Sequence, residues 1–205
     1  MKESINFLLA GVGGQGTILA SDVLVNVGLI AGFQAKQAEV HGMAQRGGSV
    51  TSHVRWGKVV YSPLIGAGEA DVLLAFEELE ALRSLNSMHP GALVLVNTQV
   101  IKPLTAITGD QVYPDDERVR TAFARLTSNL EFINGEEIAR SLGNIKAANV
   151  VLLGALSALL ERSGQASQEL IPEVWLKVII ERVPPKYVEL NRKAFQAGRE
   201  AVGKK

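Results

Sequence analysis

The feature that most constrains the fold is a glycine-rich corner near the start of the chain. An apolar run at residues 5–10, INFLLA, leads into the spacing Gly11-x-Gly13-x-x-Gly16. Apolar side chains then recur at helical spacing over residues 17–30. A strand buried on both faces, a tight turn and a helix in this order are typical of an α/β fold, with the turn at the carboxyl edge of the sheet.

Strand and helix patterns alternate along much of the remaining chain. A strand at residues 33–40 is expected to form a right-handed βαβ unit with the first strand. Gly57-Lys58 predicts a turn that joins 49–56 and 59–64 into a hairpin. The other expected elements are strands at 70–76, 91–97 and about 130–135, and helices at 77–85, 115–128, 135–142, 147–162, 171–182 and 185–201.

These patterns predict a three-layer α/β/α fold with a mostly parallel, Rossmann-like sheet, which one hairpin makes mixed. We expect one domain over residues 1–205, with an α/β core to about residue 143 and a helical C-terminal part at about 144–205. The apolar stretch at 147–160 is too short to span a bilayer and reads as a buried helix. With no apparent signal peptide, the expected location is the cytoplasm.

Composition excludes several chemistries. The chain has no cysteine, so it holds no disulfide, zinc–thiolate site, thiol nucleophile or cysteine-bound iron–sulfur cluster. Lysine and arginine (21) balance aspartate and glutamate (21), which gives no indication of nucleic acid or an anionic membrane as a partner. No metal-ligand spacing is present. Among the few histidines, His53 and His89 are expected to be structural, and Trp175 is expected in the core.

The glycine spacing admits three interpretations. A dinucleotide-binding loop would use the glycines for a tight turn and for close approach of a diphosphate to the helix start. That interpretation requires a carboxylate about 20 residues further on, but the first one, Glu39, lies 23 residues after Gly16. The alternatives are a structural corner with incidental anion affinity, or a loop that serves another ligand or partner.

A second polar loop, EVHGMAQRGGSV at residues 39–50, is the most unusual stretch of the chain. It combines three glycines, two of them next to Arg46, with the polar side chains of Glu39, His41 and Gln45. A guanidinium can bind a carboxylate or phosphate through two hydrogen bonds. An anion clamp and a solvated surface turn both remain open. Strand order predicts that this loop lies beside the first glycine loop.

The two loops together resemble a known family. GVGGQG followed by RGG resembles the gamma subunit or domain of the 2-oxoacid:ferredoxin oxidoreductases. Three longer stretches, EVHGMAQRGGSV, SPLIGAGEADVLLAFE and NIKAANVVLLGAL, most resemble the beta subunit of the indolepyruvate-specific members. The resemblance extends to about residue 160. A free-standing NAD(P)-binding oxidoreductase is the alternative, and a purely structural assembly subunit is a third possibility.

The resemblance implies an assembly that decarboxylates a 2-oxoacid on thiamine diphosphate with Mg, passes electrons through iron–sulfur clusters to ferredoxin, and forms an acyl-CoA. It places the thiamine site and the clusters on partner subunits, so this chain alone would hold no cofactor and would be catalytically silent. Other members carry Tyr-Gly-Pro-Glu before the arginine, where this chain has residues 41–45, HGMAQ. That difference favours aryl-2-oxoacids such as indolepyruvate.

The expected ligand-binding residues come from the two loops and from the start of the long apolar helix. None is expected to be catalytic or to bind a metal. They are Gly11, Gly13, Gly14, Gln15, Gly16, Thr17, His41, Gln45, Arg46, Gly47, Gly48 and Asn149. Whether the loops contact CoA, the 2-oxoacid or a neighbouring subunit stays open, as does the choice between a capping role and a ligand-facing role for Asn149.

Overall fold

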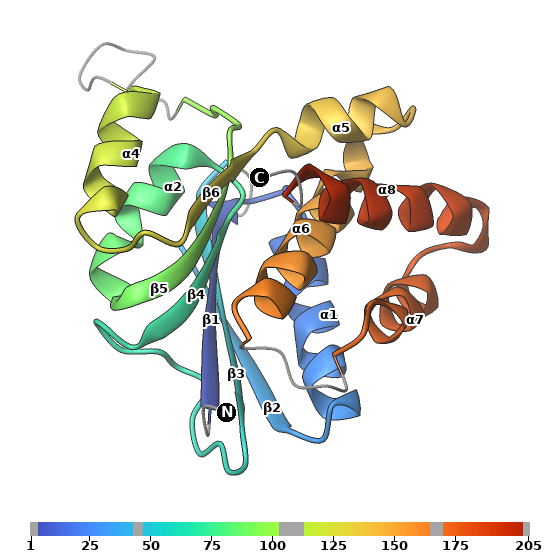
Figure 1. Ribbon diagram of the computed structural model, residues 1–205, viewed down its shortest axis with the longest axis horizontal. Helices are drawn as coiled ribbons and strands as arrows, with labels where there is room; N and C mark the ends of the chain where they lie inside the picture. Colours follow the sequence, from blue (N-terminus) through green and yellow to red (C-terminus); the bar gives the residue numbers. More distant parts are fainter. Residues whose placement is uncertain (1–3, 43–46, 103–112, 165–169, 203–205) are drawn as a thin grey trace.

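The computed structural model describes residues 4–42, 47–102, 113–164 and 170–202, and these form a six-stranded sheet flanked by helices (Figure 1). The strands are β1 (Ser4–Val12), β2 (Gln34–His41), β3 (Ser49–Gly57), β4 (Ala70–Ala75), β5 (Met88–Asn97) and β6 (Leu130–Ile133). The α-helices are α1 (Thr17–Ile30), α2 (Glu78–Arg83), α4 (Asp116–Ala124), α5 (Gly135–Ser141), α6 (Ala148–Arg162), α7 (Pro172–Arg182) and α8 (Val188–Ala201). Short 3₁₀ turns are η1 (Leu85–Ser87), η2 (Ile145–Ala147) and η3 (Pro185–Tyr187).

The strand order is β2-β3-β1-β4-β5-β6. β1, β4, β5 and β6 pair in parallel, whereas β3 is antiparallel to both β1 and β2. The predicted mostly parallel sheet with one hairpin is therefore confirmed. β1 and β2, the two strands of the expected βαβ unit, run parallel but do not pair directly, because β3 lies between them.

The hairpin joins different segments from those predicted. β3 pairs with β2 along its length, from Gln34 opposite Gly57 to His41 opposite Val50. The expected return strand at 59–64 does not form. Within this segment, the Leu64 carbonyl accepts a hydrogen bond from the Arg55 side chain at 3.0 Å, in place of one from the backbone N–H of a neighbouring strand. Pro63, which has no N–H to donate, also disfavours a paired strand there.

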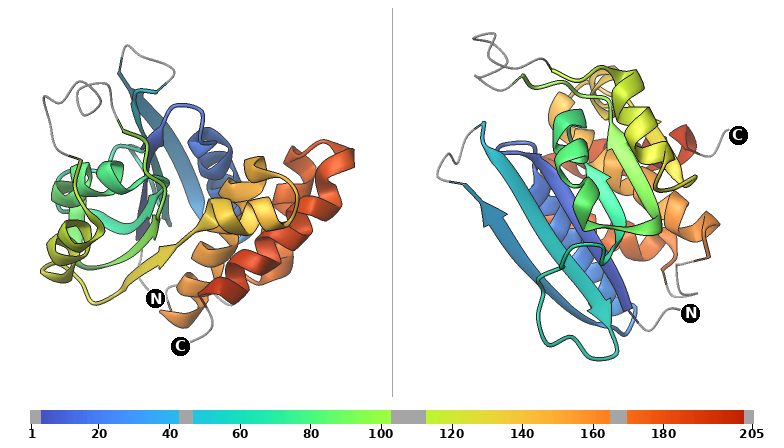
Figure 2. Two further views of the ribbon diagram at one scale, coloured as in Figure 1. Left: turned by 90° about the horizontal axis from the view of Figure 1, so that it is seen from above. Right: turned by 90° about the vertical axis from the view of Figure 1, so that its left-hand side faces the viewer.

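Alternating side chains of the strands belong to two separate hydrophobic cores, one on each face of the sheet. On one face, Phe7 and Leu9 belong to a cluster with α1, α6, α7 and α8. On the other face, Leu8 and Ala10 pack with α2 and α4, where Phe123 is fully buried. Figure 2 shows that the second pair of helices covers only the β4–β6 side of its face. We call β4–β6 the covered half and β2–β3 the open half; β1 lies between them.

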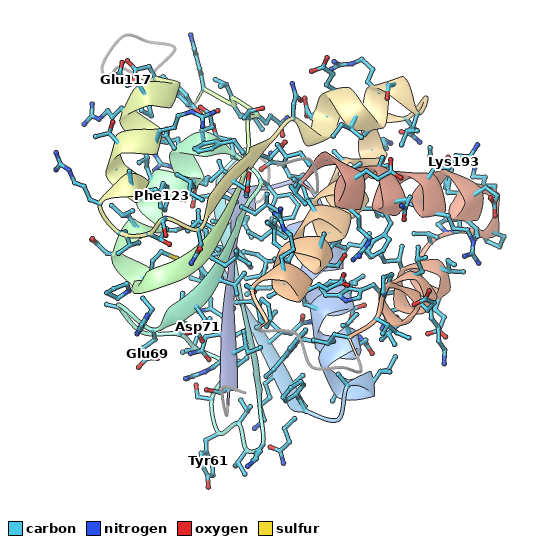
Figure 3. The ribbon with its side chains drawn as sticks, viewed as in Figure 1. Tyr61, Glu69, Asp71, Glu117, Phe123 and Lys193 are labelled. Carbon is cyan, nitrogen blue, oxygen red and sulfur yellow. The ribbon has the colours of Figure 1, made fainter. Side chains whose placement is uncertain are left out.

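The open half is packed against α1 on one face alone. Trp56 is fully buried there, and its indole N–H donates to the Leu24 carbonyl at 3.1 Å. A Cβ at Gly28 of α1 would lie 2.4 Å from the indole nitrogen, so this glycine lets the helix approach the strand. The segment after β3 lies at the far end of the sheet, where Tyr61 is 91% exposed and projects outward (Figure 3).

Two reciprocal glycine contacts join α6 to α8. A Cβ at Gly154 would lie 2.0 Å from the Phe195 carbonyl oxygen, and a Cβ at Gly198 would lie 1.9 Å from the Val151 carbonyl oxygen. The two helix backbones therefore touch directly. This contact fixes α6 against the sheet and brings the first residues of α6 to the carboxyl edge.

Within the part of the chain that the structure describes, no helix combines the length and apolar character needed to cross a membrane. The same residues contain no group of three or more His, Asp or Glu side chains arranged to hold a metal ion.

Candidate functional site

The glycine loop at the end of β1 has the backbone geometry that its sequence predicts. Gly14 and Gly16 have φ values of 107° and 85°, in the left-handed region that favours glycine. The Gln15 N–H donates to the Val12 carbonyl at 3.2 Å and closes the turn. Gly16 then precedes α1 as its N-cap without a capping side chain. The first N–H groups of α1 are therefore available to a ligand.

The second glycine loop lies directly beside the first. The Gly13 N–H donates to the Gly48 carbonyl at 2.9 Å, and the Gly47 N–H lies 3.5 Å from the Gly13 carbonyl oxygen. The strand pairing of Val12 with Ser49 continues this contact. The predicted proximity of the two loops is thus observed, and the inserted strand β3 produces it.

Gln15 does not point into solvent from the loop. Its Oε1 accepts from the Val12 N–H at 2.6 Å, and its Nε2 donates to the Phe76 carbonyl at 2.9 Å and to Gln99 Oε1 at 2.5 Å. The Gln99 amide in turn donates to the Glu136 carboxylate. One side chain therefore joins the ends of β1 and β4 to the segment that follows β5.

Two cavities adjoin the glycine loop, and both are lined by Gly13, Gly14 and Gly16. The first, which we call the α6 cavity, has a volume of about 590 Å³. Its other lining residues come from the ends of β4 and β5 and from the starts of α5 and α6: Gln15, Phe76, Asn97, Gln99, Ile101, Glu136, Ile145, Lys146, Ala148, Asn149 and Leu152.

The second, which we call the β2 cavity, has a volume of about 470 Å³. Besides the three glycines it is lined by Thr17, Ile18, Glu39, His41 and Val50. The glycine loop therefore separates two cavities of similar size. A long ligand that crosses the loop can place one part on each side of it.

Asn149 lies in the first turn of α6 and faces the glycine loop. A Cβ at Gly16 would lie 2.5 Å from Asn149 Nδ2, so only glycine leaves room for this amide. The cap of the preceding 3₁₀ turn is Asn144, whose side chain accepts from the Lys146 N–H. Asn149 Oδ1 accepts from the adjacent Val150 N–H at 2.8 Å. Asn149 therefore bonds an N–H of the first turn of α6 and also lines the α6 cavity.

Comparisons with known proteins agree over nearly the whole chain. Residues 6–201 match the family model described as pyruvate ferredoxin/flavodoxin oxidoreductase. The chain belongs to this family. Indolepyruvate oxidoreductase subunit IorB of Thermococcus kodakarensis is 40% identical over 204 residues, covering 98% of this chain and 97% of the relative.

Solved structures of the family have the same fold. The gamma subunit of a keto/oxoacid ferredoxin oxidoreductase from Geobacter sulfurreducens has a TM-score of 0.66 at 28% identity and covers 97% of this chain and 98% of its own. A 2-oxoglutarate:ferredoxin oxidoreductase from Magnetococcus marinus, solved with 2-oxoglutarate, coenzyme A and succinyl-CoA bound, has a TM-score of 0.71 at 19% identity. It covers 98% of this chain, which matches 31% of that longer chain, and shows the shared fold.

The chain is thus a gamma-type subunit of the 2-oxoacid:ferredoxin oxidoreductases. Of its sequence-predicted site residues, Gly13, Gly14, Gly16 and Asn149 line the α6 cavity, and His41 and Thr17 line the β2 cavity. Gly11 is not among the lining residues of either cavity; a Cβ there would lie 2.9 Å from Gln15 Oε1, so it gives that side chain room. Gln45 and Arg46 lie outside the described residues.

Sequence reasoning missed the wall that faces the glycine loop. Asn97 is buried and donates to the Phe76 carbonyl at 3.0 Å, while its Oδ1 accepts from the Gly135 N–H at 2.9 Å. Gln99 and Glu136 complete this wall. Polar residues directly after predicted parallel strands are the signal that could have identified them, because such strand ends share one edge.

Buried carboxylates lie behind the site at the start of α2. Glu77 accepts from the Glu80 N–H and from the Ile101 N–H at 3.0 Å, as well as from the Tyr113 hydroxyl. Burial and the hydrogen bond to the Glu77 carboxylate raise the pKa of Tyr113 well above its ordinary value, so the phenol stays a donor. Glu80 accepts from Ser49 at 2.5 Å and so ties α2 to the second loop.

The remaining expectations concern residues away from the site. His53 Nδ1 accepts from the Ile65 N–H at 3.1 Å, and burial lowers the pKa of its ring. Trp175 is 1% exposed and belongs to the core, which confirms its predicted place.

Proposed function

We propose that this chain is the non-cluster subunit of a thiamine-diphosphate-dependent 2-oxoacid:ferredoxin oxidoreductase that forms acyl-CoA from indolepyruvate or a similar aryl-2-oxoacid. Its share of the reaction is to complete the CoA and substrate side of an active site whose reacting groups lie on a partner subunit, and to hold the assembly together. The observation that carries the proposal is the pair of hydrogen-bonded glycine loops at the carboxyl edge, with a cavity on each side.

The choice of CoA as the ligand rests on chemistry and on a relative. CoA is long and carries a diphosphate near its middle, which suits a loop with exposed helix N–H groups between two cavities. The Magnetococcus marinus enzyme with this fold was solved with coenzyme A bound. The preference for an aryl-2-oxoacid rests on the indolepyruvate enzymes among the relatives and on the HGMAQ stretch before Arg46.

The redox cofactors belong to partners in this proposal. The chain has no cysteine to ligate an iron–sulfur cluster. Thiamine diphosphate with Mg, bound on a partner, would supply the electron sink for decarboxylation of the 2-oxoacid, and partner iron–sulfur clusters would supply the route for electrons to ferredoxin. The residues described above serve binding and orientation: N–H groups of the glycine loop donate to the CoA phosphates, and Gln15 holds that loop against the residues that follow β4 and β5.

A free-standing NAD(P)-dependent enzyme is the weaker candidate. Dinucleotide recognition uses a carboxylate at the end of the strand next to β1. Here β3 occupies that place, so the strand that carries Glu39 lies two strand spacings, roughly 10 Å, from β1.

Purification of the chain from its native host tests the proposal. We expect co-purification, at near-equal amounts, of a subunit that carries thiamine diphosphate and iron–sulfur clusters. The complex should reduce ferredoxin with indolepyruvate only when CoA is present. Arg46→Ala should lower that activity while the complex still assembles. Recovery of the chain alone, with a dinucleotide bound at micromolar affinity, would favour the NAD(P) candidate instead.

A further inference from the structure

β2 is one of the two edge strands of the sheet, and its outer edge is open. The strand is eight residues long, and most of its side chains are exposed on both faces. Within the described residues, no backbone hydrogen bond joins β2 to a segment other than β3. Figure 2 shows β2 at the rim of the fold, beyond β3. Such an edge presents a row of unpaired N–H and C=O groups that can pair with another strand.

The opposite edge strand, β6, is better protected. It has four residues, and side chains of two helices lie against it. The Arg120 guanidinium of α4 lies 3.9 Å from the centre of the Phe132 ring, and Arg162 of α6 lies 3.7 Å from the Glu131 carboxylate. β2 has no proline and no bulge in its register with β3, and its one lysine, Lys36, donates to a carbonyl of the segment after β3 at 3.3 Å. The devices that usually prevent strand pairing are therefore weaker at β2.

The strand pairing identifies which backbone groups of β2 face outward. The Gly13 N–H donates to the Gly48 carbonyl, and the register of β1 with β3 continues from this bond. In an antiparallel ladder, residues that bond one neighbouring strand alternate with those that bond the other. Even-numbered residues of β3 therefore bond β1, and its odd-numbered residues bond the even-numbered residues of β2. The outward-facing residues of β2 are Ala35, Gln37, Glu39 and His41.

A second copy of β2 can pair with this edge in an antiparallel manner about a twofold axis. The axis makes the residue at the centre face its own copy. With Ala38 at the centre, every outward-facing residue finds a partner. Gln37 lies opposite Glu39 of the second copy, which places an amide donor opposite a carboxylate. Ala35 lies opposite His41 in the same way. Ala38 faces itself in a closely spaced, non-hydrogen-bonded pair, which suits its small side chain.

Other centres are less favourable. Lys36 or Glu39 at the centre would place like charges directly opposite each other. With Gln37 at the centre, His41 would pair with Phe33, whose N–H already donates to a carbonyl of α1 at 3.0 Å. Centres nearer the ends of the strand would pair fewer residues. One register therefore uses every outward-facing residue of β2 and keeps like charges from facing each other directly.

We propose that β2 pairs with β2 of a second copy of this chain about a twofold axis at Ala38, so that the two sheets join into one. Glu39 and His41 also line the β2 cavity. Residues directly opposite in a strand pair share one face of the sheet. Gln37 of the second copy therefore lies at the rim of each β2 cavity. The pairing does not depend on which ligand the glycine loops bind.

Sedimentation of the full chain over a range of concentrations tests the pairing. One strand pair is a small interface, so we expect a dimer with a dissociation constant on the order of 10–100 μM. Ala38→Lys and Ala38→Glu each place like charges opposite each other at the axis, which should raise this constant about fivefold. An equimolar mixture of the two variants should dimerise again, because the facing charges are then opposite. No recovery in the mixture would overturn the proposed axis.

Disulfide crosslinking tests the register separately, because the chain has no cysteine of its own. In a non-hydrogen-bonded antiparallel pair the Cα atoms lie about 4.5 Å apart, a distance that a disulfide bridges. With oxidised glutathione, Ala38→Cys should form a covalent dimer about tenfold faster than Lys193→Cys, an exposed control on α8 (Figure 3). Gln37→Cys would place the two thiols on a diagonal, about 7–8 Å apart, and should be no faster than the control.

Three results would count against the pairing. A chain that stays monomeric at every concentration, with Ala38→Cys no faster than Lys193→Cys, would refute it. Faster crosslinking of Gln37→Cys than of Ala38→Cys would overturn the register. Slower hydrogen exchange in β2 only after a partner subunit is added would assign the edge to that subunit instead of a second copy. None of these measurements involves CoA or a 2-oxoacid, so their failure is distinct from failure of the proposed function.

Discussion

The two halves of the sheet are built differently. The covered half, β4–β6, is packed by helices on both faces; β4 is buried throughout and β5 is buried from Ala92 to Asn97. The open half, β2–β3, is covered by a helix on one face only, where α1 packs against it. Most residues of β2 are exposed. On its other face a non-helical segment is tied down by side chains such as Arg55.

The candidate site lies at β1, where the halves meet. On the side of the covered half, the site has a wall that includes Asn97 at the end of β5 and Asn149 in α6. The contact between α6 and α8 holds α6 in place. The open half supplies the second glycine loop, which is held by strand pairing and backbone hydrogen bonds. The difference indicates that one side of the site is set by packing and the other by hydrogen bonds, and the following variants test that distinction.

The largest effect is expected at the contact between α6 and α8. Gly198→Ala would place a methyl group 1.9 Å from the Val151 carbonyl oxygen, so the helices must separate. We expect the free energy of unfolding, from urea denaturation, to fall by about 3 kcal/mol. This loss would occur although alanine is the better helix former. Gly42→Ala in the open half, where an added Cβ meets nothing within 4 Å, should be close to neutral. A neutral Gly198→Ala would show that packing does not fix α6.

Gln15 joins the end of β1 to the covered half, and its replacement is expected to have the next largest effect. Gln15→Leu keeps the volume of the side chain but leaves the Val12 N–H without its partner, so we expect a loss of about 2 kcal/mol. Gln37→Leu, on the exposed edge strand β2, is the matched control and should change stability by less than about 0.5 kcal/mol. In the assembled enzyme, Gln15→Leu should raise KM for CoA. Equal stability of the two variants would contradict the bridging role.

A smaller and local effect is expected in the open half. Arg55 donates to Asn6 at 2.9 Å and to the Leu64 carbonyl at 3.0 Å. Arg55→Ala should lower the free energy of unfolding by about 1 kcal/mol. Hydrogen exchange at residues 58–66 should quicken, while exchange in β4 and β5 stays unchanged. Arg192→Ala on α8, which removes an exposed i,i+3 ion pair with Glu189, serves as the control. Uniformly faster exchange would show that the two halves unfold as one unit.

The smallest effect concerns pH and the same half. Burial lowers the pKa of His53 below its ordinary 6.5. The unfolded chain therefore binds this proton more readily, and stability present above pH 6.5 declines as the pH falls below it. In the His53→Asn variant, the asparagine Oδ1 can still accept the hydrogen bond from the Ile65 N–H. The melting temperature of this variant should therefore fall less between pH 7.5 and pH 5.5 than that of the wild-type chain. An unchanged pH profile would rule out His53 as its source.

The sequence predicted the elements of the covered half well. Continuous apolar runs such as 70–76 indicate strands buried on both faces, and the glycine spacing before residue 17 defined the corner. The pairing partner of β3 was harder to predict. Period-two alternation over 49–56 indicates a strand, but either neighbour in the chain can pair with it. The loop to β2 is longer than the two-residue turn at Gly57-Lys58, and the shorter connection was the wrong choice.

Half of the candidate site was also visible in the sequence. A glycine spacing of this kind indicates a tight turn, because glycine readily adopts positive φ values. The turn at Gly14 and Gly16 could therefore be predicted from the sequence. The opposite wall could not, because Gln99 and Glu136 carry no pattern of their own and meet Gln15 only through the fold. The role of Asn149 depends on where α6 begins in space, which the contact with α8 determines.

The hydrogen bond from Gly13 to Gly48 has a consequence for how such a site can diversify. Both its donor and its acceptor are backbone atoms, so no exchange of side chains within residues 43–46 removes it. Substitutions at the intervening positions can therefore accumulate while the ends of the loop keep their place beside the first glycine loop. The sequence between two such backbone-held ends can change without loss of the fold.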